Sequence, residues 1–462
     1  MVAGDQALWM GGAVMSYGDL FGRVGRLAER LRAWAGWPEV GVARVGLLAD
    51  NGMEYVLVAL AVLKAGGCFV PVAGELAGPE REELVRTTAL HAVLALGRHE
   101  WPGGGELLDE GLALRASRLA GAEPRFPVEA FEALGPAFIR FSSGTTGLSK
   151  GVVLSHRSLW ERIGVANRAL RIGPADRVLW TLPMAHHFAV SILLYLRFGA
   201  TTVIEPARMA AELLATAEAS RATVVYGAPF HHALLAADRG GFGWPTLRLA
   251  VSTAAALREA TARAFLERFG HPLSQALGVI ECGLPLINLD DPVGQAESVG
   301  RPVEGWEVAL RNEAGDGDAG ELWLRGPGMF DAYLDPWQAR AEATDDGWFS
   351  TGDLCRRDHG GVIRILGRSK SAINVGGMKV FPEEVEAVLD QDPAVARSRV
   401  IAQQHPVFGW VPVAEVVAAA GMVPDVAALR AACRDALSPH KVPVAVRLVG
   451  ALPVTANGKL KR

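Results

Sequence analysis

The stretch from residue 139 to residue 156, IRFSSGTTGLSKGVVLSH, constrains this chain more than any other. Hydroxyl-bearing residues alternate there with glycines, and a single cation, Lys150, follows them. Glycine permits sharp turns that bring backbone N–H groups close to an anion, while hydroxyls and a lysine add donors and positive charge. The pattern predicts a phosphate-holding loop between two apolar strands, and the alternative is a polar surface turn. The residues predicted to contact phosphate are Ser142, Ser143, Gly144, Thr145, Thr146, Gly147 and Lys150.

This run is not a Walker A loop, because that pattern has a glycine directly before the lysine and Ser149 stands there. Its residue order resembles the signature loop of the adenylate-forming superfamily, which includes acyl-CoA ligases, aryl-acid ligases, peptide-synthetase adenylation domains and luciferases. The resemblance implies that ATP and a carboxylic acid react to form an acyl-AMP and pyrophosphate. Charge accumulates on phosphate oxygens in that reaction, so cations, hydrogen-bond donors and Mg²⁺ are needed around them.

Composition and charge exclude several other classes of protein. The chain has 462 residues, of which 50% are hydrophobic and 21% charged, as expected for a globular protein of two to four domains. A net charge of −4 gives no reason to expect nucleic acid or an anionic membrane as a partner. The four cysteines form no CxxC pair, which favours reduced thiols over a zinc site.

The N-terminus has no basic region followed by an apolar core, so we expect no signal peptide. The longest apolar run, Tyr55 to Leu63, is too short to cross a bilayer. We therefore expect a cytoplasmic protein without a membrane span, either a monomer or a homodimer.

Helical and strand patterns alternate along the chain and predict a mixed α/β fold. Ser16 and Asp19 form a helix-start box, after which Leu20, Val24 and Leu27 recur at helical spacing. Such alternation with short apolar strands predicts parallel sheets covered by helices. Strands are expected at Val42–Leu48, Cys68–Val72, Ala92–Ala95 and Val178–Thr181, and a second helix at Tyr55–Lys64.

The clearest domain boundary falls where a strand ends in a short charged linker, Leu366 to Lys370. Residues 1–369 are predicted to form a large N-terminal domain of stacked αβ subdomains, with a small β subdomain at about 296–366. Residues 370–462 are predicted to form a small mobile α+β domain. In the β subdomain, strands are expected at Trp306–Arg311 and Glu321–Arg325, separated by a Gly/Asp-rich turn at Gly315–Gly320.

The segment from Gln275 to Glu281 occupies the place of a superfamily segment that carries an aromatic residue, Gly, Thr and Glu. The resemblance implies that Glu281 binds Mg²⁺ and that Gln275 hydrogen-bonds the adenine edge, with Ala276, Leu277 and Gly278 beside it. Leu277 replaces the aromatic that stacks on adenine, and Ile280 replaces a threonine that meets the α-phosphate. Each change removes about 1 kcal/mol of binding. A catalytically weakened regulator that binds a nucleotide or an acyl-adenylate is therefore an alternative.

Two short motifs resemble the superfamily's ribose clamp. In Ser350-Thr-Gly-Asp353 the carboxylate of Asp353 would accept from both ribose hydroxyls, and Arg368 would flank the same sugar. The alternative for the first motif is a plain turn.

The last motifs belong to the predicted C-terminal domain. The resemblance makes Lys370 the hinge, and it assigns the thiol tunnel to Gly376, Gly377 and Lys379. The alternative for these glycines is an ordinary hairpin turn. Lys459, in the closing segment Pro453 to Arg462, would bridge the attacking carboxylate and the α-phosphate as a mobile point charge.

The acid pocket is assigned by the same resemblance. Two histidines in Pro183-Met-Ala-His-His-Phe188 lack metal-ligand spacing, and His187 matches a residue that gates the acyl pocket. No Asp lies between Trp180 and Ala200 to hold an amine, which argues against an α-amino acid. Thr253 and Ala254 replace a glycine pair, which favours an aryl or a short to medium acyl acid over a long fatty acid. The pocket residues are His187, Phe188, Tyr226, Gly227, Phe230, Thr253, Ala254, Ala255, Leu277, Gly278 and Ile280.

The expected acceptor is a thiol, either CoA or the phosphopantetheine arm of a carrier protein. An amine acceptor that would give an amide, and a luciferase-like oxygenase, are further alternatives. The catalytic residues implied by the resemblance are Lys459, Glu281, Thr145 and His187.

Overall fold

A computed structural model describes residues 4–74, 76, 78–120, 122–141, 150–189, 191–207, 209–312, 315–368, 371, 373–375, 378–405, 409–454 and 460. The chain divides into two compact units. The first contains residues 1–307 and 325–349, and the second contains residues 308–324 and 350–462.

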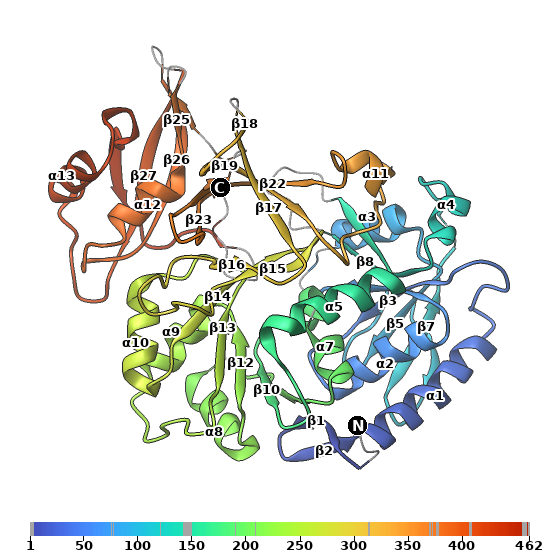
Figure 1. Ribbon diagram of the computed structural model, residues 1–462. Helices are drawn as coiled ribbons and strands as arrows, with labels where there is room; N and C mark the ends of the chain where they lie inside the picture. Colours follow the sequence, from blue (N-terminus) through green and yellow to red (C-terminus); the bar gives the residue numbers. More distant parts are fainter. Residues whose placement is uncertain are drawn as a thin grey trace. The chain divides into compact units, whose positions relative to one another are not determined.

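The first unit is built on two nine-stranded sheets (Figure 1). One of them has a parallel centre, β1-β11-β10-β12-β13-β14, with antiparallel strands at both edges. Its strands, in sheet order, are β16 (Arg301–Pro302), β15 (Gly283–Ile287), β14 (Leu273–Val279), β13 (Leu249–Ser252), β12 (Val224–Gly227), β10 (Arg177–Trp180), β11 (Thr201–Ile204), β1 (Gln6–Met10) and β2 (Ala13–Ser16).

The other sheet has the same plan, with a parallel centre β8-β4-β3-β5 and antiparallel edges. Its strands, in sheet order, are β21 (Gln338–Ala339), β20 (Ala332–Tyr333), β9 (Gly151–Ser155), β8 (Pro136–Phe141), β4 (Cys68–Val72), β3 (Arg44–Leu48), β5 (Ala92–Leu96), β7 (Leu114–Arg118) and β6 (Glu106–Asp109). Every residue of β3, β4 and β5 is buried, as expected for parallel strands covered on both faces.

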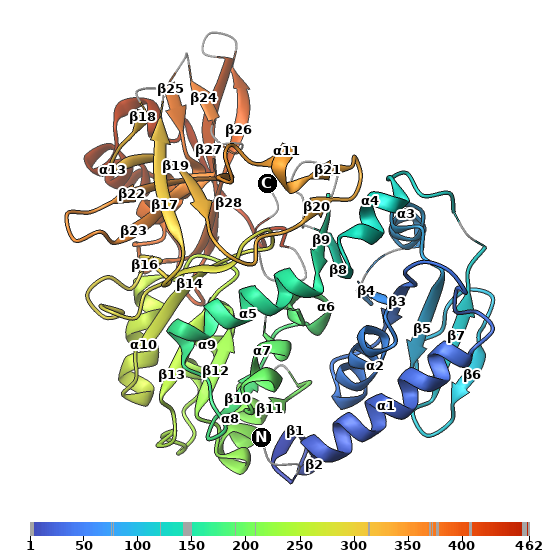
Figure 2. The ribbon, with the colours of Figure 1, turned by 45° about the vertical axis from the view of Figure 1, so that its right-hand side comes forward.

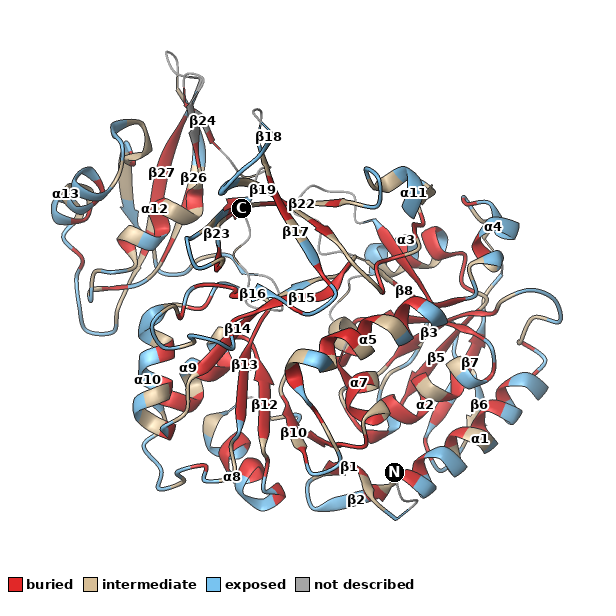
Figure 3. Cartoon of the chain, in the orientation of Figure 1, coloured by how far each residue is buried: buried red, intermediate tan, exposed pale blue. Residues whose placement is uncertain are grey.

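Several helices, such as α1, α5 and α10, have one buried apolar side and one exposed side (Figure 3). The long helices α1 and α2 pack side by side (Figures 1 and 2), and α5 lies between the two sheets in both views. The helices are α1 (Tyr17–Ala33), α2 (Met53–Lys64), α3 (Gly78–Thr88), α4 (Val128–Ala133), α5 (His156–Leu170), α6 (Met184–His187), α7 (Ile192–Arg197), α8 (Ala210–Ser220), α9 (Pro229–Ala237), α10 (Glu259–Phe269) and α11 (Arg340–Ala343).

The start of α1 confirms the predicted helix-start box. The Ser16 hydroxyl oxygen accepts from the Asp19 backbone N–H at 3.1 Å. Leu20, Val24 and Leu27 are buried on one side of the helix. The predicted strands and second helix are also confirmed, with bounds that differ by one or two residues.

The second unit contains two five-stranded sheets. The first has β18 (Gly315–Asp316), β17 (Glu307–Asn312), β19 (Ala319–Arg325), β22 (Phe349–Arg357) and β23 (Ile363–Arg368), in that order. The second joins β25 (Met378–Val380), β24 (Ile373–Val375), β27 (Gly409–Ala418), β26 (Val395–His405) and β28 (Ala445–Leu448), with helices α12 (Pro382–Leu389) and α13 (Val426–Ala436) and a short 3₁₀ turn at Pro439–Lys441.

The first of these sheets lies within the predicted β subdomain, but that region is interrupted. Residues 325–349 belong to the first unit, where β20 pairs with β9. The predicted Gly/Asp turn is also shorter than residues 315–320, because β18 pairs with β17 and β19 already begins at Ala319. The predicted domain boundary falls at residues 369 and 370, outside the described residues, and stays a prediction. No helix among the described residues is long and apolar enough to span a membrane.

A buried arginine on α5 joins two turns of the first unit. Arg162 is 3% exposed and donates to the carbonyl oxygens of Gly328, Ile280 and Glu281 at 2.9, 2.9 and 3.1 Å. Burial lowers the pKa of Arg162 to about 10, which leaves the guanidinium charged at neutral pH. The chain can pass this close to α5 because residue 328 is a glycine. Its φ is +71°, and a Cβ there would lie 2.4 Å from the Arg162 backbone nitrogen.

We expect Gly328→Ala to destabilise the protein by about 3 kcal/mol or more. The left-handed φ alone costs roughly 1–2 kcal/mol for an L residue, and displacing a bond to a charged group adds roughly 1.5–3 kcal/mol. The matched control is Gly270→Ala, since Gly270 has a φ of +67° but open space around its Cβ position. Thermal unfolding at a fixed scan rate should show a much larger loss for Gly328→Ala, and equal losses would contradict the close approach.

Candidate functional site

Glu281 lies on the turn that joins β14 to β15. The turn is closed by the Cys282 N–H, which donates to the Val279 carbonyl at 3.0 Å. The Glu281 carbonyl accepts from the Phe330 N–H at 2.7 Å, in addition to the bond from Arg162. The backbone of Glu281 is therefore held from two directions, while its side chain remains partly exposed.

Tyr333 contacts both the Glu281 side chain and Lys150. The Tyr333 hydroxyl donates to Glu281 Oε1 at 2.9 Å. The Lys150 ammonium lies 4.4 Å from the centroid of the Tyr333 ring, in cation–π contact. Burial, and then the charge of Glu281, raises the pKa of Tyr333 well above its ordinary value, so the hydroxyl keeps its proton. The structure thus brings together Lys150, from the signature run, and Glu281.

Arg140, near the end of β8, contributes a second positive charge. Burial lowers the pKa of the Arg140 guanidinium to about 10, and the nearby Glu281 carboxylate opposes that shift. Its Nε is buried and has no hydrogen-bond partner among the described residues. Arg140 comes two residues before Ser142, so a buried cation that interacts with Glu281 directly precedes the predicted phosphate loop in the sequence.

Glu281 is suited to Mg²⁺. None of the described residues form a group of three or more His, Cys, Asp or Glu side chains that would hold a metal by itself. Mg²⁺ is commonly bound by one or two carboxylates together with substrate phosphates. A single, oriented and partly exposed carboxylate fits that mode of binding.

An aromatic group forms around the ends of β10 and β12. Trp180 stacks on Tyr226 with ring centroids 5.7 Å apart, and His187 packs edge-on against Trp180 at 5.9 Å. Burial raises the pKa of Tyr226 to about 12, partly offset by a hydrogen bond with Thr253. Gly278 adjoins this group, since a Cβ there would lie 3.5 Å from Thr253 Oγ1. His187, Tyr226, Thr253 and Gly278 of the predicted acid pocket therefore lie close together.

Ala254, which follows Thr253, has a φ of +71°. That conformation favours glycine and costs roughly 1–2 kcal/mol for any other residue. Ala254 therefore has a strained backbone conformation. Its neighbour Ala255 is exposed.

Three residues of the predicted site have the following surroundings, and their predicted contacts stay predictions. The Gln275 amide is buried, and its Oε1 accepts from the Leu257 N–H at 2.7 Å. Phe188 is fully buried against Tyr55 and Phe69 in an aromatic core. Phe230, in the first turn of α9, is 49% exposed.

The remaining residues of the predicted acid and adenine set are placed as follows. Gly227 adjoins the aromatic group, because its carbonyl accepts from the Thr253 N–H at 2.9 Å. Ala276 is buried in β14, whereas Leu277 and Ile280 are partly exposed near its end. Their predicted roles toward the acid and adenine stay predictions.

The second unit brings Asp353 and Arg368 together. They lie directly opposite each other on the antiparallel strands β22 and β23, and Arg368 Nε is 2.8 Å from Asp353 Oδ1. The Asp353 side chain is 5% exposed and that of Arg368 is 58% exposed. The pairing is compatible with the predicted ribose clamp.

Several predicted site residues lie outside the described residues. They are Ser142, Ser143, Gly144, Thr145, Thr146 and Gly147 of the signature run, and Lys370, Gly376, Gly377 and Lys459 in the C-terminal part. The side chain of Lys379, on β25, is likewise not described. Their roles stay predictions.

Three residues that contribute to the site were missed by sequence reasoning, namely Tyr333, Arg140 and Arg162. Arg140 gave a signal, since a lone charge in the apolar strand Ala-Phe-Ile-Arg-Phe needs a reason to be buried. Tyr333 and Arg162 gave none, because their partners are far away in the sequence.

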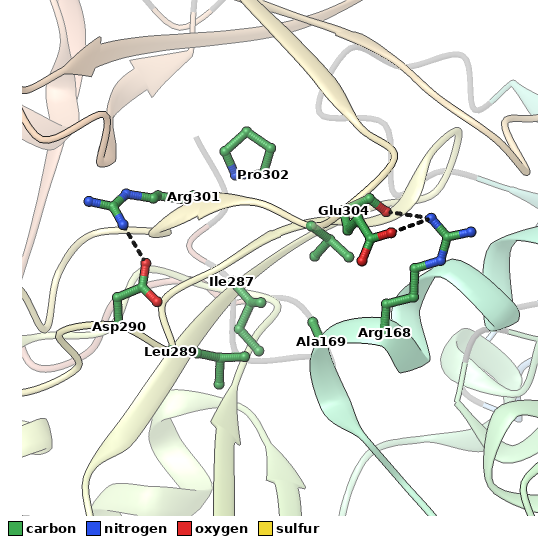
Figure 4. Close-up of a pocket in the computed structure, with 9 residues that line it drawn as sticks. Arg168, Ala169, Ile287, Leu289, Asp290, Arg301, Pro302 and Glu304 are labelled. Atoms are coloured by element: carbon green, nitrogen blue, oxygen red, sulfur yellow. Dashed lines mark hydrogen bonds and ion pairs between the residues drawn. The ribbon is translucent and has the colours of Figure 1, made fainter.

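A shallow hollow of about 140 Å³ on the first unit contains none of the predicted site residues (Figure 4). Ile287 and Leu289 form its apolar part. Arg301 pairs with Asp290 at 2.9 Å, and Arg168 Nη1 lies 3.5 Å from Glu304 Oε1. Each arginine faces a carboxylate, so the hollow offers no net positive charge to the phosphates of CoA.

Comparison with known proteins identifies the family. The model of the AMP-binding enzyme family matches residues 2–334, and that of the AMP-binding enzyme C-terminal domain matches residues 384–459. The crystal structure of ATP-bound MatB from Rhodopseudomonas palustris is similar with a TM-score of 0.85 and 27% identity, over 99% of this chain and 94% of that one.

Curated relatives agree with this result. A feruloyl-CoA synthase from Amycolatopsis is 29% identical, covering 97% of this chain and 93% of the relative. A 3-[(3aS,4S,7aS)-7a-methyl-1,5-dioxo-octahydro-1H-inden-4-yl]propanoyl:CoA ligase from Mycobacterium tuberculosis is 32% identical, over 91% and 87%. A naringenin synthase from Pestalotiopsis fici is 33% identical over 71% of this chain, but the chain spans only 12% of that relative. The chain therefore belongs to the AMP-binding enzyme family, within the adenylate-forming superfamily that its signature loop resembles.

Proposed function

We propose that this protein is an AMP-forming ligase that joins a small carboxylic acid to a thiol, with CoA as the acceptor. In the first step the acid carboxylate attacks the α-phosphate of ATP, which forms acyl-AMP and releases pyrophosphate. In the second step the thiol sulfur attacks the acyl carbon, which forms a thioester and releases AMP, with the thiol proton passing to solvent.

The observation that carries the proposal is the contact of Lys150 and Glu281 through Tyr333. Tyr333 contacts both a cation from the signature run and the carboxylate predicted to hold Mg²⁺. This supports the proposal, because phosphate charge has to be balanced by cations and a metal while ATP reacts. When bound there, Mg²⁺ supplies neutralisation and orientation of the phosphate oxygens.

Other residues of the chain have proposed roles in binding the ribose, the acid and the thiol. We propose that Asp353 and Arg368 hold the ribose and that Lys459 binds the acid carboxylate and the α-phosphate during the first step. The C-terminal domain then turns about Lys370, which withdraws Lys459 and brings the Gly377 segment to the thiol. These assignments follow the resemblance of the motifs.

For the acid, we propose an aryl or a short to medium acyl substrate. The predicted pocket residue Tyr226 stacks on Trp180, which supports an aromatic environment, and we infer from the sequence that Thr253 and Ala254 narrow the pocket. Feruloyl-CoA synthase, one of the relatives, acts on an aryl acid by its name. A CoA acceptor agrees with the names of the relatives, and a carrier protein is the alternative.

The first test is acid-dependent release of pyrophosphate with ATP and Mg²⁺, without a thiol, across aryl, short, medium and long acids. We expect release with the aryl or the short to medium acids, and thioester on addition of CoA. If no acid causes pyrophosphate release from protein that still binds ATP, the result would favour the alternative of a catalytically weakened regulator. Leu277 and Ile280 are the residues in the sequence that suggest this alternative. Release with long acids alone would contradict the proposed substrate class.

Separate variants should affect the two steps differently. We expect Lys459→Ala to reduce pyrophosphate release by 10²-fold or more, about the loss of one transition-state contact, while thioester formation from supplied acyl-AMP is spared. Lys370→Pro should preserve pyrophosphate release and block thioester formation, because proline fixes φ at the hinge. The measurements are pyrophosphate release and consumption of synthetic acyl-AMP with CoA. Equal damage to both steps by Lys459→Ala would refute this division.

The strained Ala254 gives a prediction about both stability and substrate range. We expect Ala254→Gly to raise the free energy of unfolding by about 1 kcal/mol, because glycine adopts a positive φ freely. It should also raise kcat/KM for longer acids relative to short ones, because it removes a methyl group from the narrowed pocket. The control is Ala255→Gly, next in the chain but without a positive φ, which should lose stability. No gain in stability for Ala254→Gly would contradict the strain.

A further inference from the structure

We propose that Tyr333 is a positioning residue that aligns Glu281 for the metal and Lys150 for the nucleotide phosphates at the same time. The inference rests on the proposed function and deepens it, since neither the sequence motifs nor the family comparison assigns a role to Tyr333. One side chain would thereby set the geometry of two motifs that are 131 positions apart.

The first contact orients the Glu281 carboxylate. Tyr333 is 7% exposed, and its hydroxyl donates to Glu281 Oε1 at 2.9 Å. A carboxylate on a turn rotates freely unless a donor holds one of its oxygens. Hydrogen-bond partners of metal ligands fix the ligand's orientation, and their loss typically costs about 10–100-fold in metal affinity or activity.

The second contact positions Lys150 through the face of the same ring. The Lys150 side chain is exposed and long, so without a partner it would sample many rotamers. An ammonium over a tyrosine ring at 4.4 Å gains about 0.5–1 kcal/mol at an exposed site. This contact keeps the charge beside Glu281 instead of in open solvent.

The backbone around Tyr333 is fixed firmly enough for this role. Tyr333 pairs with Val152 on β9, and the Leu334 N–H donates to the Gly151 carbonyl at 2.7 Å. On the other side, Asp331 accepts from the Ser155 N–H at 2.6 Å and from the Ser158 hydroxyl at 2.9 Å. Hydrogen bonds to β9 and to the start of α5 therefore fix the backbone on both sides of Tyr333, and its partner Val152 lies two residues after Lys150.

The two contacts use different parts of the side chain, so substitutions can separate them. Tyr333→Phe keeps the ring for Lys150 and removes the donor to Glu281. Tyr333→Leu removes both. Tyr17→Phe is the matched control, because the buried Tyr17 hydroxyl donates to the Ala200 carbonyl at 2.8 Å and no predicted site residue is involved.

The experiment is calorimetric titration of ATP into the full chain, without acid, at a series of Mg²⁺ concentrations and in EDTA. For Tyr333→Phe we expect ATP affinity in EDTA to be unchanged and the Mg²⁺ concentration for half-maximal enhancement to rise at least 10-fold. For Tyr333→Leu we expect that rise together with weaker ATP binding in EDTA. Tyr17→Phe should match the wild type in both conditions, even if its melting temperature falls.

A double-mutant cycle tests the route through Glu281. In the Glu281→Gln background, Tyr333→Phe should no longer change the Mg²⁺ dependence, because the carboxylate that it orients is gone. Independent, additive losses would overturn the inference, as would a Tyr333→Phe protein with the Mg²⁺ dependence of the wild type. Failure of the wild-type chain to bind ATP would overturn the proposed function as well, whereas normal ATP binding with an unaffected Tyr333→Phe would overturn this inference alone.

Discussion

The candidate site depends on one buried cation. The guanidinium of Arg162 is planar and carries five donors, which suits it to binding several carbonyl oxygens at once. Here it holds the Glu281 turn and the Gly328 turn against α5. A buried charge left without these partners would be costly, so the two turns and α5 are bound into one arrangement. The position of Glu281 follows from that arrangement more than from β14 alone.

Two environments meet at the end of β14. On one side, Glu281 lies among Tyr333, Lys150 and Arg140, so donors and positive charge are in place before any phosphate arrives. Such preorganisation is the largest contribution to many enzyme rates. On the other side, Gly278 borders the aromatic group of Trp180 and Tyr226. Gly278, beside the aromatic group, and Glu281, beside the charged residues, are only three positions apart. This arrangement suits a substrate that has a reactive carboxylate and an apolar body.

Sequence reasoning reached the α/β fold and the main elements of the first unit because their signals are local. A cap at Ser16 and apolar residues repeating every 3.6 positions are enough to predict α1. Short apolar runs are enough to predict the parallel strands. The family followed from the order of residues in the signature run. The motif assigns Gln275 to adenine, which stays a prediction. The hydrogen bond that its amide oxygen accepts from the Leu257 N–H was not foreseen, because sequence alone does not place that loop beside β14. Tyr333 and Arg162 were missed because the residues that they contact lie 52 or more positions away in the sequence.

The return of residues 325–349 to the first unit has a consequence for synthesis on the ribosome. When translation has reached residue 302, every strand of the first nine-stranded sheet exists. The second sheet still lacks β20 and β21, and the nascent chain has no Gly328 carbonyl for Arg162 and no Tyr333 for Glu281. The core of the first sheet can therefore form before Glu281 acquires these contacts, whereas the core of the second sheet still lacks Ala332 and Leu334. The contacts of Glu281 with Tyr333 and of Arg162 with Gly328 can therefore form only late in translation, after residues 308–324 of the second unit have been made.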